Sequence, residues 1–189
     1  TPVDALQVPA TVQAVLAARI DRLPAREKRL LQVASVIGKD FREPLLAAVA
    51  ALDADELKNA LAVLQRAEFI HEQAIYPVAE YAFKHPLTQE VALGSQLRER
   101  RRQVHATVAR AIEEQDAKQL DERAALLAHH YEEAGEALTA ARWHRRAAEW
   151  VGRTDFAAAV HHWGRVRVLL RELSGDHEAA VLGIAACRQ

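Results

Sequence analysis

The segment from Tyr81 to Ala92 constrains the fold more than any other part of this sequence. A short alternating apolar run, Tyr81 and Phe83, ends at His85, and Pro86 follows as a suitable first residue of a helix. Proline fits that position because it has no amide hydrogen to lose in the first helical turn. The segment therefore predicts a β-strand that passes directly into an α-helix, with a single histidine at the junction.

The composition of the 189-residue chain favours closely packed helices. Half of the residues are hydrophobic, only 5% are aromatic, and alanine is abundant, a mixture that suits helices better than a β-sandwich. The formal net charge is −1, so there is no overall basic signature for nucleic acid or membrane. The single cysteine, Cys187, and the lack of a long apolar run or signal peptide predict a cytoplasmic protein without membrane association.

The first part of the chain predicts helices followed by a β-hairpin. Apolar residues at helical spacing and proline or N-cap signals define the helices, and Asp53 with Glu56 marks the start of the last one. We expect helices at 8–23, 24–38, 44–50 and 53–67, and strands at 69–72 and 81–83 with a loop at 74–80 between them. This order is that of a winged-helix domain, with the loop as its wing.

From Pro86 onward the sequence predicts helices alone. They are expected at 86–95, 97–115, 119–134, 137–152, 156–172 and 176–188. The polar stretch at 113–118 is the expected joint between two domains. Residues 1–115 would form the winged-helix region with linking helices, and residues 116–189 would begin a domain of antiparallel helix pairs. The expected fold class is therefore mainly α.

Large and small residues recur in the last third of the chain at a spacing similar to that of tetratricopeptide repeats. The pattern is carried by Trp143, Ala147, Trp150, Phe156, Ala159 and Trp163, with a weaker copy around Ala124, Ala128, Tyr131, Gly135 and Ala140. In such repeats, large residues interlock and small ones let paired helices approach closely. We expect a tetratricopeptide-like array whose aromatic side chains are buried between helices rather than lining a ligand groove.

The sequence contains no motif typical of catalysis or of metal binding. Gly38–Asp40 lacks the upstream glycine and the hydroxyl residue of a phosphate-binding loop, so Gly38 is expected to end a helix. The pairs His129-His130 and His161-His162 are adjacent, which would point the two rings of each pair about 100° apart on a helix. No further histidine lies four residues away, so we expect no zinc-binding helix.

A basic cluster follows the strand-to-helix junction and consists of Arg98, Arg100, Arg101 and Arg102. A basic stretch beside a winged helix is compatible with DNA binding. Two features disfavour that function: the third predicted helix of the winged helix begins with three carboxylates, which would face phosphates, and the wing has no lysine or arginine. We therefore expect a solvated helix face or an intramolecular contact, with DNA binding as the alternative.

His85 allows two interpretations from physical chemistry alone. A histidine before a helix can cap it or pack beside Pro86, and that structural role is the commoner one. The N-terminus of a helix also favours anions, to which an imidazole can donate a hydrogen bond. His85 is thus a candidate either for capping or for contact with a phosphate.

Four blocks of this sequence together resemble a known arrangement. They are the segments 8–24, 30–38, 83–92 and 98–105. Their combination resembles the region after the ATPase module in bacterial signalling proteins of the STAND class. The nearest relatives by this resemblance are adenylate/guanylate cyclase proteins, in which a cyclase domain precedes an AAA-type ATPase, a winged helix and tetratricopeptide repeats. LuxR-type regulators with a similar ATPase-plus-repeat build come next.

The resemblance implies a role for His85. In the STAND class a Met-His-Asp-type motif places a histidine near the β-phosphate of ADP. Here Phe83, Lys84 and His85 end a strand in the matching position, although Pro86 stands where that motif has aspartate. The resemblance implies that His85 senses the phosphate of ATP or ADP, which an upstream ATPase domain of a longer chain would bind.

The resemblance also implies a non-catalytic function. The segment would couple the nucleotide state of that ATPase domain to the repeats, which would receive a protein or a small ligand, and it would hold no cofactor of its own. The alternatives are a LuxR-type transcription regulator whose winged helix binds DNA through the basic cluster, and a plain scaffold without nucleotide coupling.

Overall fold

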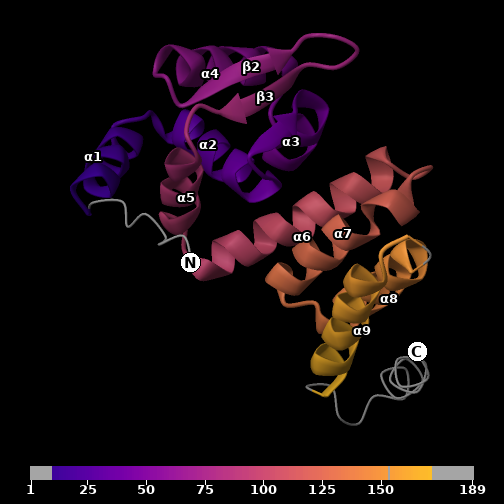
Figure 1. Cartoon of the computed structure of the whole chain (residues 1–189). Helices are drawn as coiled ribbons and strands as arrows, with labels where there is room; N and C mark the ends of the chain where they lie inside the picture. Colours follow the sequence, from indigo (N-terminus) through magenta and orange to yellow (C-terminus); the bar gives the residue numbers. More distant parts are fainter. Residues whose placement is uncertain (1–9, 153, 172–189) are drawn as a thin grey trace. The chain divides into compact units, whose positions relative to one another are not determined.

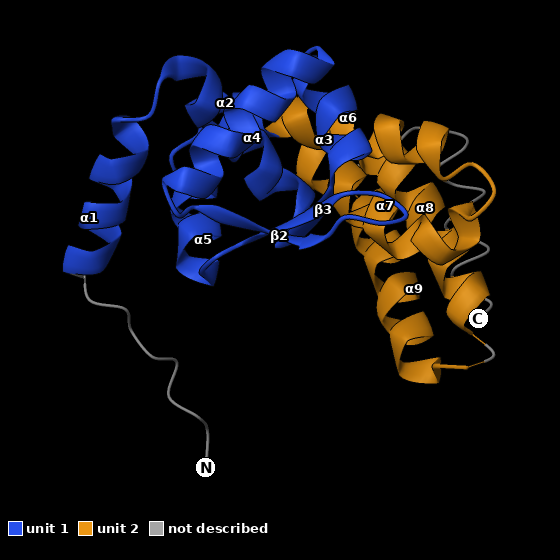
Figure 2. Ribbon diagram, turned by 90° about the horizontal axis from the view of Figure 1, so that it is seen from above, with its two compact units in different colours: residues 1–101 blue, residues 102–189 orange. Residues whose placement is uncertain are grey.

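The computed structural model describes residues 10–152 and 154–171 of the chain (Figure 1). This part is mainly α-helical, with nine helices and a small three-stranded antiparallel sheet. The chain divides into two compact units, residues 1–101 and 102–189, which Figure 2 shows in different colours. Within the described ranges, no helix combines the length and the apolar character needed to cross a lipid bilayer.

The first unit contains the sheet and the first five helices. Along the chain its elements are α1 (Ala10–Asp21), α2 (Ala25–Ile37), β1 (Asp40–Arg42), α3 (Glu43–Ala50), α4 (Ala54–Arg66), β2 (Ile70–Ala74), β3 (Glu80–Phe83) and α5 (Pro86–Gly94). Apart from β1, these bounds agree with the predicted ranges to within two residues. The strand-to-helix junction before α5 is confirmed.

Consecutive helices form the rest of the described chain: α6 (Arg98–Gln115), α7 (Leu120–Ala134), α8 (Ala137–Val151) and α9 (Phe156–Arg171). The division of the chain into two compact units falls within α6, between residues 101 and 102. From the sequence, the domain boundary is expected after residue 115. The later part of α6 belongs with α7, as the hydrogen bond of 2.6 Å from the Tyr131 hydroxyl to Glu113 illustrates. The helix predicted at 176–188 lies outside the described residues.

Strand β1 is the element that the sequence analysis missed. The strand order is β1-β3-β2, so β3 is central and pairs antiparallel with both neighbours. Phe41 of β1 lies opposite Tyr81, and the two rings stack with centroids 6.1 Å apart. Three residues are too few to show an alternating pattern. What makes this segment a strand is its pairing with a distant part of the chain.

Two helix ends have the chemistry that the sequence predicts. The Asp53 carboxylate accepts a hydrogen bond of 2.8 Å from the backbone N–H of Glu56, which is the predicted N-cap of α4. Gly38 follows α2 and donates its backbone N–H to the carbonyl of Ala34. Its φ of +151° is a conformation that favours glycine. Gly38 is therefore a helix-ending residue, as expected.

The core of the first unit forms around α2. Leu30 and Leu31 are buried there, and α2 packs against α3, α4, α5 and β1. Side chains within and just after α5 reinforce this packing, because Gln89 and Gln96 each donate a hydrogen bond of 3.1 Å to a backbone carbonyl of α2. These contacts fix α5, and with it the histidine that precedes the helix.

Small residues form the helix interfaces of the second unit, where α7 packs on α8 and α8 on α9 (Figure 1). The buried alanines of α7, α8 and α9 are Ala124, Ala128, Ala140, Ala141, Ala147, Ala148 and Ala159. Small side chains let helix backbones approach closely, so this part of the repeat prediction agrees with the observed packing.

The prediction of buried aromatic residues is wrong for two of them. Trp150 is 52% exposed and Phe156 is 77% exposed. Trp150 lies near the end of α8, and Phe156 is the first residue of α9. Phe156, Val160 and Trp163 line a pocket of about 250 Å³ beside the turn between α8 and α9. A partly open apolar surface therefore replaces the expected interlock.

Candidate functional site

His85 lies at the junction of β3 and α5 with an exposed side chain. Its backbone is extended, and its Nδ1 accepts a hydrogen bond of 3.1 Å from the backbone N–H of Leu87. The His85 carbonyl accepts a further hydrogen bond of 2.9 Å from the N–H of Thr88. The capping interpretation of His85 is confirmed, and contact with a phosphate stays a prediction.

The cap determines where the imidazole of His85 carries its proton. A nitrogen that accepts a hydrogen bond is unprotonated, so the neutral ring carries its proton on Nε2. This N–H belongs to an exposed side chain at the N-terminus of a helix, where anions are favoured. One nitrogen can thus cap the helix while the other donates to an anion. The neighbouring Lys84 already pairs with Glu68 at 2.7 Å.

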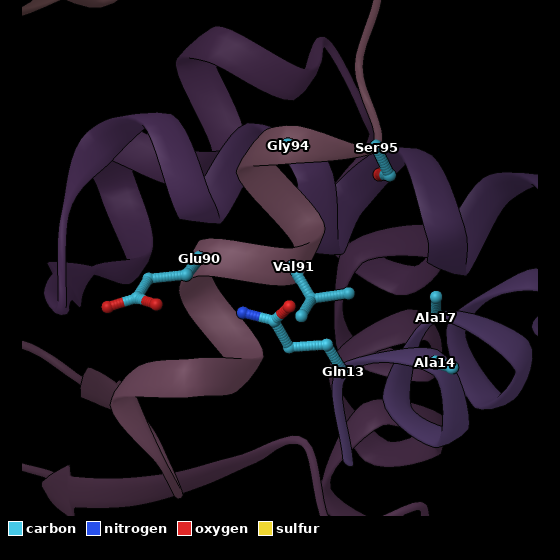
Figure 3. A pocket seen from close by; sticks show the side chains of 7 residues that line it. All are labelled: Gln13, Ala14, Ala17, Glu90, Val91, Gly94 and Ser95. Carbon is cyan, nitrogen blue, oxygen red and sulfur yellow. The ribbon is translucent and has the colours of Figure 1, made fainter. Parts of the chain in front are cut away.

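A pocket of about 500 Å³ lies between α1 and α5. Figure 3 shows the side chains of Gln13 and Val91 facing one another across it, with the Glu90 carboxylate directed away. Its remaining lining residues are Ala14, Ala17, Gly94 and Ser95. This lining contains a single charged group and does not include His85. The pocket is therefore separate from the predicted phosphate contact.

The four arginines of the basic cluster differ in their surroundings. Arg98 and Arg100 are exposed, and Arg101 is half-buried. Arg102 donates a hydrogen bond of 3.1 Å from Nε to the carbonyl of Ala134, at the C-terminus of α7. A guanidinium at that position donates to a carbonyl that has no partner within the helix, and its positive charge interacts favourably with the negative end of the helix dipole. The expected intramolecular contact is found at Arg102.

Gly135 lies directly against this guanidinium. Its φ is +80°, and an added Cβ would collide with the side chain of Arg102. We expect Gly135→Ala to lower the free energy of unfolding of the second unit by about 1–2 kcal/mol, because alanine is strained at positive φ. Gly164→Ala is the matched control in α9, where an added Cβ meets nothing within 4 Å. Urea unfolding measures both, and equal losses would contradict the prediction.

Three histidines meet between α6 and α7, and we call them the triad: His105, His129 and His130. One ring nitrogen from each lies within 4.8 Å of the other two. The Nδ1 atoms of His105 and His130 are 2.9 Å apart. Those two residues are buried, and His129 is exposed. In the described part of the chain, these three histidines are the group of possible ligands whose spacing is suited to a metal ion.

The imidazole of His130 favours its neutral form. Burial, with further contributions from His105 and His129, lowers the pKa of His130 to about 3. The Nε2 atom of His130 is also buried and has no hydrogen-bond partner within the described ranges. A neutral imidazole has a lone pair, so it can accept a hydrogen bond or bind a metal ion.

A second histidine pair lies between α8 and α9. The Nδ1 atoms of His144 and His162 are 2.9 Å apart, and the Nε2 of His144 lies 2.9 Å from the Glu132 carboxylate. Burial lowers the pKa of His144 although Glu132 opposes the shift, and burial also lowers the pKa of His162. Burial alone would raise the pKa of Glu132, but hydrogen bonds from Arg165 and His144 outweigh it and the pKa is lowered.

Sequence reasoning missed both histidine groups because it compared positions along a single helix. The partner of His130 lies 25 residues away on α6, and that of His162 lies 18 residues away on α8. The available signal was the repeated His-His dipeptide at 129–130 and 161–162. The second member of each dipeptide contacts a histidine on the preceding helix.

The geometry offers hydrogen-bond donors and imidazole ligands at separate places. His85 presents a donor at the start of α5, and the triad presents three ring nitrogens in the second unit. No protein-family model and no curated protein matches this chain.

Proposed function

We propose that this chain is a non-catalytic regulatory and interaction segment of a multidomain, ATP-dependent signalling protein of the STAND class, whose effector is a nucleotide cyclase. The first unit acts as a winged helix that contacts an ATPase domain of the same protein. The second begins a tetratricopeptide-like array that receives a protein or a small ligand. The ATPase domain binds ATP or ADP, and the protein works in the cytoplasm.

The order of elements supports this proposal. In the first unit, α2, α3 and α4 are followed by the hairpin of β2 and β3, and β1 completes the sheet on the other side of β3. In the second unit, successive helices pack on one another across short turns. A helix–strand–helix–helix–hairpin order is that of a winged helix, and stacked helix pairs with alanine interfaces are typical of helical repeats.

The observation that carries the proposal is the geometry of His85. Its Nδ1 is occupied by the cap of α5, so Nε2 is the donor of the neutral ring on an exposed side chain. A hydrogen bond to a charged phosphate is worth about 1.5–3 kcal/mol, which changes an equilibrium by about tenfold or more. This is enough for His85 to bias a nucleotide-dependent equilibrium between two states of the longer protein.

Two substitutions separate the sensing role of His85 from its capping role. His85→Ala removes the cap and the donor together. His85→Asn keeps a side-chain acceptor suited to capping but lacks the reach of the imidazole Nε2. In the longer protein that contains the ATPase domain, we expect both variants to retain at least about tenfold less tightly bound ADP than the unmodified protein. Nucleotide content after denaturation, measured by chromatography, checks this result.

Thermal unfolding of the same variants provides the control. His85→Ala is expected to lose about 1 kcal/mol of stability with the cap, and His85→Asn is expected to lose less. Normal ADP content in His85→Asn, with folding intact, would make His85 a helix cap alone. The chain would then be a scaffold without nucleotide coupling.

The alternative function, a transcription regulator that binds DNA through the basic cluster, has weaker support. Arg102 is engaged with the end of α7. The exposed side chains of the wing include Ile75 at 77% and Tyr76 at 89% exposure, which offer no positive charge to a phosphate. An electrophoretic mobility shift tests the alternative. Sequence-selective binding at physiological salt would favour DNA recognition, whereas weak binding that salt abolishes would reflect the basic patch alone.

A further inference from the structure

The triad brings together three imidazoles from two helices. His105 comes from α6, and His129 and His130 come from adjacent positions on α7. The ring centroid of His105 lies 5.8 Å from that of His129 and 5.2 Å from that of His130. The 100° between neighbours on one helix is no obstacle here, because the ring centroids of His129 and His130 are only 5.3 Å apart and His105 contacts both rings from another helix. From these contacts we propose that the triad binds a divalent transition-metal ion.

The spacing of the nitrogens fits an ion of this class. Two nitrogens 2.9 Å apart, as in His105 and His130, would make an angle of about 90° at an ion bound at about 2.1 Å. A tetrahedral zinc ion would widen the nitrogen separation to about 3.4 Å, a movement of about half an ångström. Rotation of the exposed His129 side chain supplies the third ligand. Water can occupy the remaining position of the ion.

The ligand type selects the ion. Three imidazoles suit zinc, copper or nickel, whereas calcium and magnesium prefer oxygen ligands. Ligation requires the unprotonated form of each ring, and His130 is buried, where a charged imidazolium is disfavoured. The Nε2 of His130 has no partner in the described part of the chain, and it can carry the proton of the neutral ring while Nδ1 binds the ion.

Access to the site comes from the exposed side. His129 is in contact with solvent, whereas His105 and His130 are buried behind it. An ion can thus be captured by His129 and completed by the buried pair. Binding replaces the hydrogen bond between the two Nδ1 atoms. The proton of that bond moves to Nε2 of the same ring, so each ligand remains a neutral imidazole.

The second histidine pair gives an internal comparison. His144 and His162 have the same separation of 2.9 Å between Nδ1 atoms. The Glu132 carboxylate, however, lies at Nε2 of His144, whereas His162 lies at Nδ1. Glu132 and His162 therefore cannot bind one ion together with His144. Among the described residues no group of three suitable ligands forms there. His161 is the exposed member of that dipeptide and corresponds to His129 of the triad.

Isothermal titration calorimetry of the tag-free 189-residue chain with zinc or nickel ions tests the proposal. We expect one ion per chain. His129→Ala should weaken the dissociation constant by at least about tenfold, and the matched control His161→Ala should change it by less than about twofold. Both positions are exposed, so neither variant is expected to disturb the core.

A spectroscopic measurement adds a readout of the ligands themselves. Electron paramagnetic resonance of the copper-loaded chain should show nitrogen hyperfine coupling, with fewer coupled nitrogens in His129→Ala than in His161→Ala. Failure to bind one ion, or an equal loss of affinity in the two variants, would overturn the proposal and assign the weak binding to surface histidines. The outcome is independent of whether His85 contacts a nucleotide.

Discussion

Leu127→Ala is expected to lower the free energy of unfolding of the second unit by about 2–5 kcal/mol. Leu127 is fully buried on α7. Many of the other buried residues of α7, α8 and α9 are alanines. Small, closely packed residues cannot extend into the space that a leucine side chain leaves. The cavity should therefore persist, and the cost should include both the lost burial and the empty volume.

Leu126→Ala is the matched control for this prediction. Leu126 is the adjacent residue on the same helix, but it is 38% exposed. Both variants change helix propensity equally, so the difference between them isolates the effect of burial. We expect Leu126→Ala to cost less than about 1 kcal/mol. Similar costs for the two variants would show that α7 does not pack as described.

Tryptophan fluorescence measures this effect selectively. All three tryptophans of the chain, Trp143, Trp150 and Trp163, lie in the second unit. Urea unfolding followed at their emission therefore reports that unit, and a second probe such as circular dichroism reports the whole chain. Separate transitions by the two probes would give each unit its own free energy of unfolding.

The sequence predicted the helical elements well because their signals are local. Proline, glycine and N-cap residues such as Asp53 mark where helices begin and end, and apolar spacing marks their buried faces. Strand β1 escaped prediction because the three residues from Asp40 become a strand only by pairing with β3. The exposed Trp150 escaped it for a related reason, since the repeat pattern does not say whether another helix covers the end of α8.

The two candidate sites also differ in whether the sequence alone could predict them. His85 was predictable because a histidine before Pro86 at the end of a strand is a local pattern. The triad was not, because its geometry depends on the register between α6 and α7, which places His105 opposite His130. The repeat of a histidine contact between α8 and α9 then follows from the similar packing of successive helices. Long-range register is what a single sequence does not reveal.

The second large effect is expected from acid. Burial lowers the pKa of His144 and of His162 below that of an exposed histidine. As the pH falls, the unfolded chain therefore binds protons that the folded chain does not. The contribution of this pair to the free energy of unfolding is complete above about pH 6.5 and decreases as the pH falls below that value. Each such histidine can contribute up to about 1.4 kcal/mol per pH unit, and partial exposure of His162 reduces its share. We expect the free energy of unfolding to be lower at pH 5 than at pH 7 because of this pair.

The charged groups around the pair act on this titration in opposite directions. Glu132 on α7 favours protonation of His144, whereas Arg165 and His161 on α9 oppose it. Glu132 itself stays ionised in this range, because its pKa is lowered overall by the hydrogen bonds from Arg165 and His144. The net effect follows burial, so the pair binds protons at a lower pH in the folded state than in the unfolded chain.

His162→Asn isolates the contribution of this pair from that of other histidines. The asparagine amide can hydrogen-bond to Nδ1 of His144 but does not titrate. Urea unfolding of the metal-free chain in chelator, followed by tryptophan fluorescence at pH 7 and pH 5, should show a smaller loss of stability in the variant. If the variant and the unmodified chain lost the same free energy, the buried pair would not set the acid response. A smaller loss in the variant would identify the interface of α8 and α9 as a pH-sensitive contact of the second unit.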